Sequence, residues 1–234
     1  MNRFDGRWMA LAGVILAGIV TAMQPLPAKE ISQTRPASKL IDSFDRKPPA
    51  MKYLTYGTEQ VSVQEGYGVY YDKAEIHLSR VTVNGADKAL RIKYKLPQLY
   101  DWGNWVSIRR EFAAPEDFGK CEGVELRLRV EEPSEVHLRI TLCDVESRSK
   151  MQHGSDELWW YDLPADVLKT SPGKWTTLRA PFKKFALSYG AGTRHNDGRQ
   201  DFSKVVAFEI NVISKAGEQA KGTIQVSSLR GYAK

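Results

Sequence analysis

The stretch DELWWYDLP, residues 156–164, sets two tryptophans and a tyrosine side by side, followed directly by an aspartate. Neighbouring residues of a β-strand point to opposite faces of a sheet, so the three rings cannot all serve one purpose. If Trp160 faced a core, Asp162 would be buried with it, and an unpaired buried carboxylate costs several kcal/mol. We therefore predict that Trp160 and Asp162 face outward. The predicted core-facing residues are Trp159, Tyr161 and Leu163.

Alternating patterns in three other segments place further polar side chains on the same outward face. The segments are WVSIRREF (105–112), EVHLRITL (135–142) and VVAFEINV (205–212). Burying their polar residues would take several charges out of water without evident partners. The predicted outward set comprises Trp160, Asp162, Arg109, Glu111, His137, Arg139, Glu209 and Asn211. The predicted core-facing set includes Val136, Leu138, Ile140 and Leu142, together with Val206, Phe208, Ile210 and Val212.

This mixture of outward side chains suits a carbohydrate ligand. A flat aromatic ring covers the C–H face of a sugar, while guanidinium, carboxylate and amide groups match its hydroxyls. Two arginines and a histidine would also suit a uronate or a sulfated sugar. The alternative is a surface lattice of ion pairs that binds no ligand.

Three other tryptophans, Trp102, Trp105 and Trp175, lie outside this stretch. The loop LYDWGNW (99–105) would bring Trp102 and Trp105 to one end of the same sheet, either as a clamp for a chain ligand or as packing over the sheet edge. We expect Trp175 to belong to the core.

Catalysis has weak support in the sequence. Glu111 and Glu209 would lie on neighbouring strands, as a two-carboxylate glycosidase requires. However, the chain contains no Gly-x-Ser-x-Gly or His-Glu-x-x-His motif and only four histidines. We therefore expect a protein that is not an enzyme.

Eight short alternating segments separated by turn residues must position these side chains. Such a series, with one apolar and one polar face, is typical of an all-β antiparallel β-sandwich or jelly roll. Consecutive strands of a jelly roll alternate between two sheets. One sheet would hold residues 90–96, 222–229, 124–130 and 175–182. The other would hold residues 105–112, 205–212, 135–142 and 158–163.

Six landmarks occur in an order that resembles a known family. They are LIDSFD, GADKALRIKY, DFGKCEGVELRLRV, GKWTTLRAPFKKF, DFSKVVAFEINV and GTIQVSSLRGY. Together they resemble galactose-binding-like jelly rolls, in particular family 11-type carbohydrate-binding modules, and they place the domain at residues 39–234. The complex I intermediate-associated protein family, which consists of assembly factors, is similar in the same landmarks and implies a protein partner instead.

The resemblance also implies that the outward face of the second sheet is concave and carries the ligand. Members of such families often hold a structural calcium between carboxylates of the first and last strands. Asp42 and Asp45 are present here, but the last strand carries Ser227 and Ser228, which departs from the pattern. Calcium prefers several oxygen ligands that include carboxylates, so no cofactor is expected, with a structural calcium as the alternative.

The N-terminal 28 residues have the layout of a signal peptide. Arg3 and Arg7 precede an apolar run and then small residues. The run is short for a membrane-spanning helix, so we predict a cleaved signal peptide (1–28), a polar leader (29–38), and a periplasmic or secreted protein with no membrane attachment after cleavage. An uncleaved anchor is the alternative.

The composition agrees with one sizeable domain, because 42% of the 234 residues are hydrophobic. The net charge of +6 favours acidic partners in general, but no run of Lys or Arg points to nucleic acid. Export implies an oxidising compartment, in which Cys121 and Cys143 would either form one disulfide or stay as two independent thiols.

The sequence therefore predicts an exported, non-catalytic protein that binds a poly- or oligosaccharide, with an acidic glycan as one option. A protein-interaction or assembly factor on the same fold is the main alternative. A polysaccharide-degrading enzyme is the weaker one.

Overall fold

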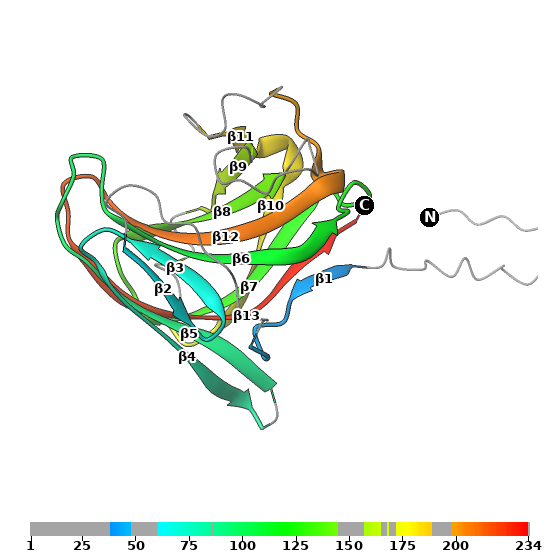
Figure 1. Ribbon diagram of the computed structural model, residues 1–234. Coiled ribbons are helices and arrows are strands. Elements are labelled where there is room, and N and C mark those ends of the chain that lie inside the picture. Colours follow the sequence, from blue (N-terminus) through cyan, green and yellow to red (C-terminus); the bar gives the residue numbers. More distant parts are fainter. Residues whose placement is uncertain are drawn as a thin grey trace, which may run out of the picture. The chain divides into compact units, whose positions relative to one another are not determined.

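The chain folds into two antiparallel β-sheets, as the computed structural model shows (Figure 1). The structure describes residues 38–47, 60–85, 87–144, 157–164, 168, 172–188 and 198–233. The predicted signal peptide and all of the leader except residue 38 lie outside these ranges. No helix within these ranges is long and apolar enough to cross a membrane.

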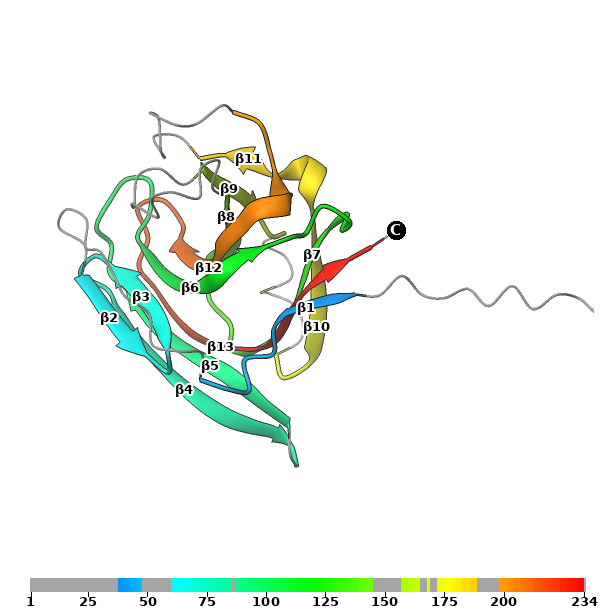
Figure 2. The ribbon, with the colours of Figure 1, turned by 45° about the vertical axis from the view of Figure 1, so that its right-hand side comes forward.

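The six-stranded sheet has the order β10-β7-β13-β5-β4, with β1 paired to β13 (Figure 2). Its strands are β1 (Lys39–Asp42), β4 (Glu75–Asn84), β5 (Asp87–Leu96), β7 (Gly123–Glu132), β10 (Trp175–Pro181) and β13 (Ala220–Tyr232).

The seven-stranded sheet has the order β11-β9-β8-β12-β6-β3-β2. Its strands are β2 (Gln60–Gln64), β3 (Tyr67–Tyr71), β6 (Trp105–Glu116), β8 (Val136–Asp144), β9 (Glu157–Asp162), β11 (Ala186–Leu187) and β12 (Val205–Ser214). The predicted division of the eight segments between two sheets is therefore confirmed, as is the antiparallel β-sandwich fold.

The core lies between the two sheets and follows the alternation of the strands. In β8 the residues Val136, Leu138, Ile140 and Leu142 are all at most 5% exposed. Strand β9 has the predicted register as well. Trp159 is 7% exposed, and its ring meets the edge of Phe202 with centroids 6.5 Å apart. Leu163 is also buried, while Tyr161 packs against the core from a half-buried position.

Strand β12 departs from the predicted alternation at its start. Its pairing with β6 and β8 shifts between Val205 and Ala207, which marks a β-bulge. The prediction of Val206 in the main core was wrong, because the bulge places it in a separate small cluster with Cys143 and Ala207.

The prediction of a core position for Trp175 was also wrong. In β10 the buried residues are Leu178 and Ala180, so Trp175 has the parity of the outer face. Two guanidinium groups lie over its ring, with Arg127 5.0 Å and Arg129 5.1 Å from the centroid. The aromatic ring is therefore covered by arginines rather than by the core.

A buried carboxylate connects the two sheets. Asp42, at the end of β1, accepts hydrogen bonds from the Tyr67 hydroxyl at 2.9 Å and from the Phe44 amide at 2.8 Å. Arg110 of β6 pairs with the same carboxylate at 2.8 Å. This pairing explains how an arginine is accommodated on the core side of β6. Burial, with Asp42 beside it, raises the pKa of Tyr67 well above the ordinary value.

Cys121 and Cys143 are both free thiols. Of the two alternatives for the cysteines, the structure therefore has the unbonded one. Their separation follows from the fold, because Cys121 precedes β7 in one sheet and Cys143 lies near the end of β8 in the other.

A second buried acidic group lies where β8 and β9 meet. Asp144 faces Glu157 across the two strands, and both residues are at most 3% exposed. Asp144 accepts a hydrogen bond from the Asp201 amide at 3.1 Å. Burial raises the pKa of Asp144 to about 7, and the charges of Glu157 and Asp201 act in the same direction.

We expect Asp144→Asn to stabilise the fold more at about pH 8 than at about pH 5. The folded chain keeps a proton on Asp144 that the unfolded chain releases between about pH 4 and pH 7. The cost of ionising Asp144 is thus absent at low pH, grows by up to about 1.4 kcal/mol per pH unit through this window, and is complete above it. Urea unfolding of both proteins at the two pH values measures the difference.

Asp101→Asn, at an exposed position in the loop before β6, is the matched control and should show no such difference. An Asp144→Asn variant that changes the free energy of unfolding equally at both pH values would contradict the prediction.

Candidate functional site

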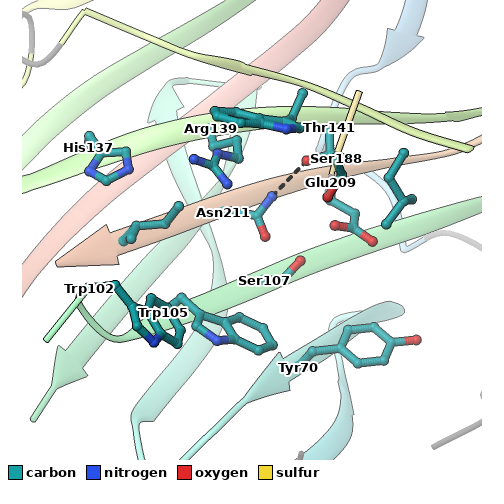
Figure 3. Close-up of a pocket in the computed structure, with 13 residues that line it drawn as sticks. Tyr70, Trp102, Trp105, Ser107, His137, Arg139, Thr141, Ser188, Glu209 and Asn211 are labelled. Carbon is teal, nitrogen blue, oxygen red and sulfur yellow. Dashed lines mark hydrogen bonds between the residues drawn. The ribbon is translucent and has the colours of Figure 1, made fainter. Parts of the chain in front are cut away.

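A pocket of about 520 Å³ lies on the outer face of the seven-stranded sheet, the face turned away from the core (Figure 3). Alternate residues of five strands and two flanking segments line it. They are Tyr70, Trp102, Trp105, Ser107, His137, Arg139, Thr141, Leu158, Trp160, Ser188, Glu209, Asn211 and Ile213. We call this the aromatic pocket.

One wall of the aromatic pocket is a clamp built around Arg139. Its guanidinium lies 3.5 Å from the centroid of the Trp160 ring. The same group donates to both oxygens of Asp162, with Nε at 2.7 Å and Nη2 at 3.1 Å. A bidentate pair that is also stacked on a ring leaves the guanidinium little freedom. One face of Trp160 is therefore covered by Arg139.

The opposite wall comes from β6 and the loop before it, where Trp105 and Trp102 lie next to each other (Figure 3). The Trp102 ring is stacked on Tyr100, with centroids 4.7 Å apart and the ring planes inclined by 6°. The Tyr100 hydroxyl donates a hydrogen bond to Asp72, which fixes this stack to the loop after β3. Trp102 remains 59% exposed, so it forms a projecting rim.

A glycine makes the turn into β6 possible. Gly103 has φ of +107°, and a Cβ there would come within 2.3 Å of the Ser214 carbonyl oxygen. Any larger residue would therefore push the loop away from β12. Asn104 then anchors the start of β6, because its backbone amide donates a hydrogen bond to the Ser214 hydroxyl at 2.7 Å.

The floor of the pocket is polar. Asn211 lies between the two walls and donates from Nδ2 to the Thr141 hydroxyl at 3.1 Å (Figure 3). The Ser107 hydroxyl is buried and has no hydrogen-bond partner among the described residues. Amide and hydroxyl groups that retain bonding capacity at the base of a hollow are suited to a polar ligand.

Arg109 lies beneath this floor rather than in it. It is 4% exposed, and Nη1 is 2.9 Å from the Glu209 carboxylate. Its Nε is 3.3 Å from Glu111, and Nη1 is also 3.3 Å from the Cys143 sulfur. Since a buried guanidinium needs such partners, Arg109 orients the two glutamates and offers no direct contact to a ligand in the pocket.

His137 lies at the end of the pocket beside Asp162, with Nε2 3.8 Å from the carboxylate. Burial lowers the pKa of His137, the charge of Asp162 opposes this, and Arg139 adds to the lowering. The net direction is downward, so the imidazole is neutral at pH 7.

Seven of the ten residues predicted for the site line the aromatic pocket: Trp102, Trp105, His137, Arg139, Trp160, Glu209 and Asn211. Arg109, Glu111 and Asp162 are on the same face but are not among the lining residues, and all three take part in ion pairs. Ion pairs of the kind expected for the alternative, a surface lattice without a ligand, are thus present, but they lie beside a pocket.

Sequence reasoning missed Tyr70 and several smaller residues of the lining. Tyr70 lies opposite Ser107 because β3 pairs with β6. Local sequence does not show which strand lies beside EGYGVYY (65–71) in the sheet. Ser107 and Thr141 were recognisable by parity alone.

The residues present do not fit the structural calcium that the family resemblance implied. The carboxylate of Asp42 is engaged by Tyr67, Phe44 and Arg110, and Asp45 accepts a hydrogen bond from Ser43. No group of three His, Cys, Asp or Glu side chains that could hold a metal occurs in the described part of the chain.

Known proteins resemble this chain in structure. No protein-family model matches the sequence, and no curated protein matches it. The family 11 carbohydrate-binding module of Clostridium thermocellum, solved in complex with a β-1,3-1,4-mixed-linked tetrasaccharide, has a TM-score of 0.56 at 13% identity. The alignment covers 84% of this chain and 95% of that module.

Two further modules are similar. A family 11 module of a cellulosomal cellulase from Clostridium thermocellum has a TM-score of 0.56 at 14% identity, covering 85% of this chain and 95% of the module. A family 30 carbohydrate-binding module has a TM-score of 0.50 at 12% identity, covering 85% and 99%. The chain thus has the β-sandwich fold of family 11 and family 30 carbohydrate-binding modules, as its resemblance to the family 11 type predicted.

Proposed function

We propose that this chain is a non-catalytic carbohydrate-binding protein that holds an oligosaccharide, or a stretch of a polysaccharide, in the aromatic pocket. One observation carries the proposal: two walls with aromatic rings, Trp160 of β9 on one side and Trp102 with Trp105 at the start of β6 on the other, flank a floor of amide and hydroxyl groups.

Sugars combine the two kinds of surface that such a pocket offers. Their ring faces present C–H groups that pack on aromatic rings, and their edges present hydroxyls that donate and accept hydrogen bonds. Asn211, Glu209 and the Ser107 hydroxyl supply both donors and acceptors at the floor. The volume of about 520 Å³ lies in the range of sites that bury a small ligand.

The fold supports the same conclusion. A module with this fold was solved with a β-1,3-1,4-mixed-linked tetrasaccharide, so a mixed-linked β-glucan is a suitable first probe. Binding without catalysis agrees with the arrangement of Glu111 and Glu209, because both carboxylates pair with the single guanidinium of Arg109. Export to the periplasm or the medium is part of the proposal and rests on the apolar N-terminal segment.

We expect Arg139→Ala to weaken glycan binding by about tenfold or more. The change removes a charge-assisted donor from the pocket wall and releases the Trp160 ring from its stack. Trp160→Ala should have an effect of similar size, because it removes the ring itself. Affinity electrophoresis of the chain in gels with mixed-linked glucan, polygalacturonate or a sulfated glycan measures both effects.

Arg179→Ala is the matched control. Arg179 also lies over an aromatic ring, 4.9 Å from the Tyr232 centroid, and pairs with Glu125 at 3.3 Å, but it is on the other sheet. It should bind glycan like the unmodified chain. If no glycan binds while a protein copurifies with the chain, the assembly-factor alternative replaces this proposal. Shortened or unsaturated glycan products would instead establish an enzyme.

The pH dependence of binding should distinguish an acidic from a neutral glycan. Because the pKa of His137 is lowered, the imidazole gains its charge only below about pH 6.5. Affinity for a uronate polymer should therefore rise as the pH falls below about 6.5, whereas affinity for a neutral glucan should stay constant. Titration calorimetry at several pH values measures this, and His137→Gln should abolish the rise. A rise that persists in His137→Gln would contradict the role of this histidine.

A further inference from the structure

A second pocket, of about 320 Å³, lies on the outer face of the six-stranded sheet, on the opposite side of the sandwich from the aromatic pocket. It is bounded by the segment after β1, by the end of β4 and the start of β5, and by residues of β7, β10 and β13. Figure 1 shows β1 beside β13 and the β4–β5 hairpin extending below them. We call this the basic pocket.

Three cationic side chains line the basic pocket: Lys88, Arg127 and Arg230. None of them forms an ion pair with a carboxylate in the described ranges. Two acidic residues also line it, Asp45 and Asp87, which leaves a formal charge of +1. One oxygen of the Asp45 carboxylate already accepts a hydrogen bond from Ser43.

Two buried polar atoms of the lining residues have no hydrogen-bond partner within the part of the chain that is described: Trp175 Nε1 and Ser227 Oγ. Buried polar groups are normally paired, because leaving one unpaired costs free energy. Arg127 and Arg129 hold the Trp175 ring from 5.0 and 5.1 Å. Ser227 stands at the shift in pairing between Val226 and Ser228, a kind of irregularity that re-aims side chains.

We propose that the basic pocket binds an oxyanion, meaning a sulfate, phosphate or carboxylate group. The unpaired indole N–H can only donate, and the guanidinium and ammonium groups have only donors, so their natural complement is a group with several acceptor oxygens. A metal cation would instead meet a net positive charge, because three cationic side chains stand against two carboxylates. This site goes beyond the proposed glycan binding, since it shares no residue with the aromatic pocket.

The test is a titration of the full chain with sodium sulfate at constant ionic strength, followed through the indole N–H signals in ¹H–¹⁵N NMR spectra. The chain has six tryptophans, and Trp175→Phe assigns the signal in question. We expect the Trp175 signal to move saturably, while the Trp160 signal stays in place. A Trp175 signal that does not respond to sulfate overturns the proposal.

Two variants and one control distinguish a specific anion-binding site from non-specific electrostatic attraction. Arg127→Gln should weaken sulfate binding by about tenfold or more. Ser227→Ala should weaken it less, because a neutral hydroxyl contributes less than a guanidinium. Arg179→Gln, on the same face but outside the pocket lining, should leave it unchanged. Equal weakening by Arg127→Gln and Arg179→Gln would show only a general effect of positive charge and would overturn the proposal.

A comparison of dextran sulfate with dextran identifies the source of the oxyanion. If dextran sulfate moves the Trp175 signal and competes with free sulfate, the pocket takes an anion carried by a glycan. If only free sulfate acts, it takes an inorganic anion. Arg139→Ala should leave the sulfate titration intact, so loss of glycan binding at the aromatic pocket and failure of the basic pocket are separate results.

Discussion

The aromatic pocket depends on ion pairs between arginines and carboxylates that lie side by side on one face of a sheet. That face carries two guanidinium groups over a sandwich core, and one of them, Arg109, is 4% exposed. A charge so placed is stable only with close carboxylates, which Glu209 and Glu111 provide. Arg139 is held in the same way by Asp162 and by the Trp160 ring. The pairs fix the walls and the floor in advance, which would reduce the entropy lost when the proposed glycan binds.

The sequence was most informative where the two possible registers of a strand differ strongly in the free-energy cost of the residues they bury. The free-energy cost of burying the Asp162 carboxylate decided the register of β9. Trp159 could therefore be assigned to the core and Trp160 to the outer face. The alternation of β8 worked for the same reason, because the other choice would have placed Arg139 in the core. Strand alternation between sheets then brought distant segments to one face, and this placed most of the candidate residues correctly.

Other features were beyond local reasoning because they depend on pairing between distant segments. The bulge at the start of β12 reverses the parity of Val206 without any glycine or proline to signal it. Tyr70 reaches the aromatic pocket only because β3 pairs with β6. Trp175 was predicted to be a core residue because it stands in the GKWTTLRAPFKKF landmark of the resembling family, yet two arginines from the neighbouring strand cover it at the surface. The burial of Arg109 could not be predicted either, because it depends on the ion pair with Glu209 of the neighbouring strand.

The two free thiols affect how the protein tolerates its surroundings. Cys143 is fully buried, and Cys121 rests against Gly231, where a Cβ would come within 2.6 Å of its sulfur. Burial raises the pKa of Cys121, which lowers the fraction of thiolate, the form that reacts with oxidants and with other disulfides. Both cysteines are free thiols, so no disulfide contributes to the stability of the sandwich as described. The limited access to the two sulfurs leaves the domain with little tendency to link to other chains through them.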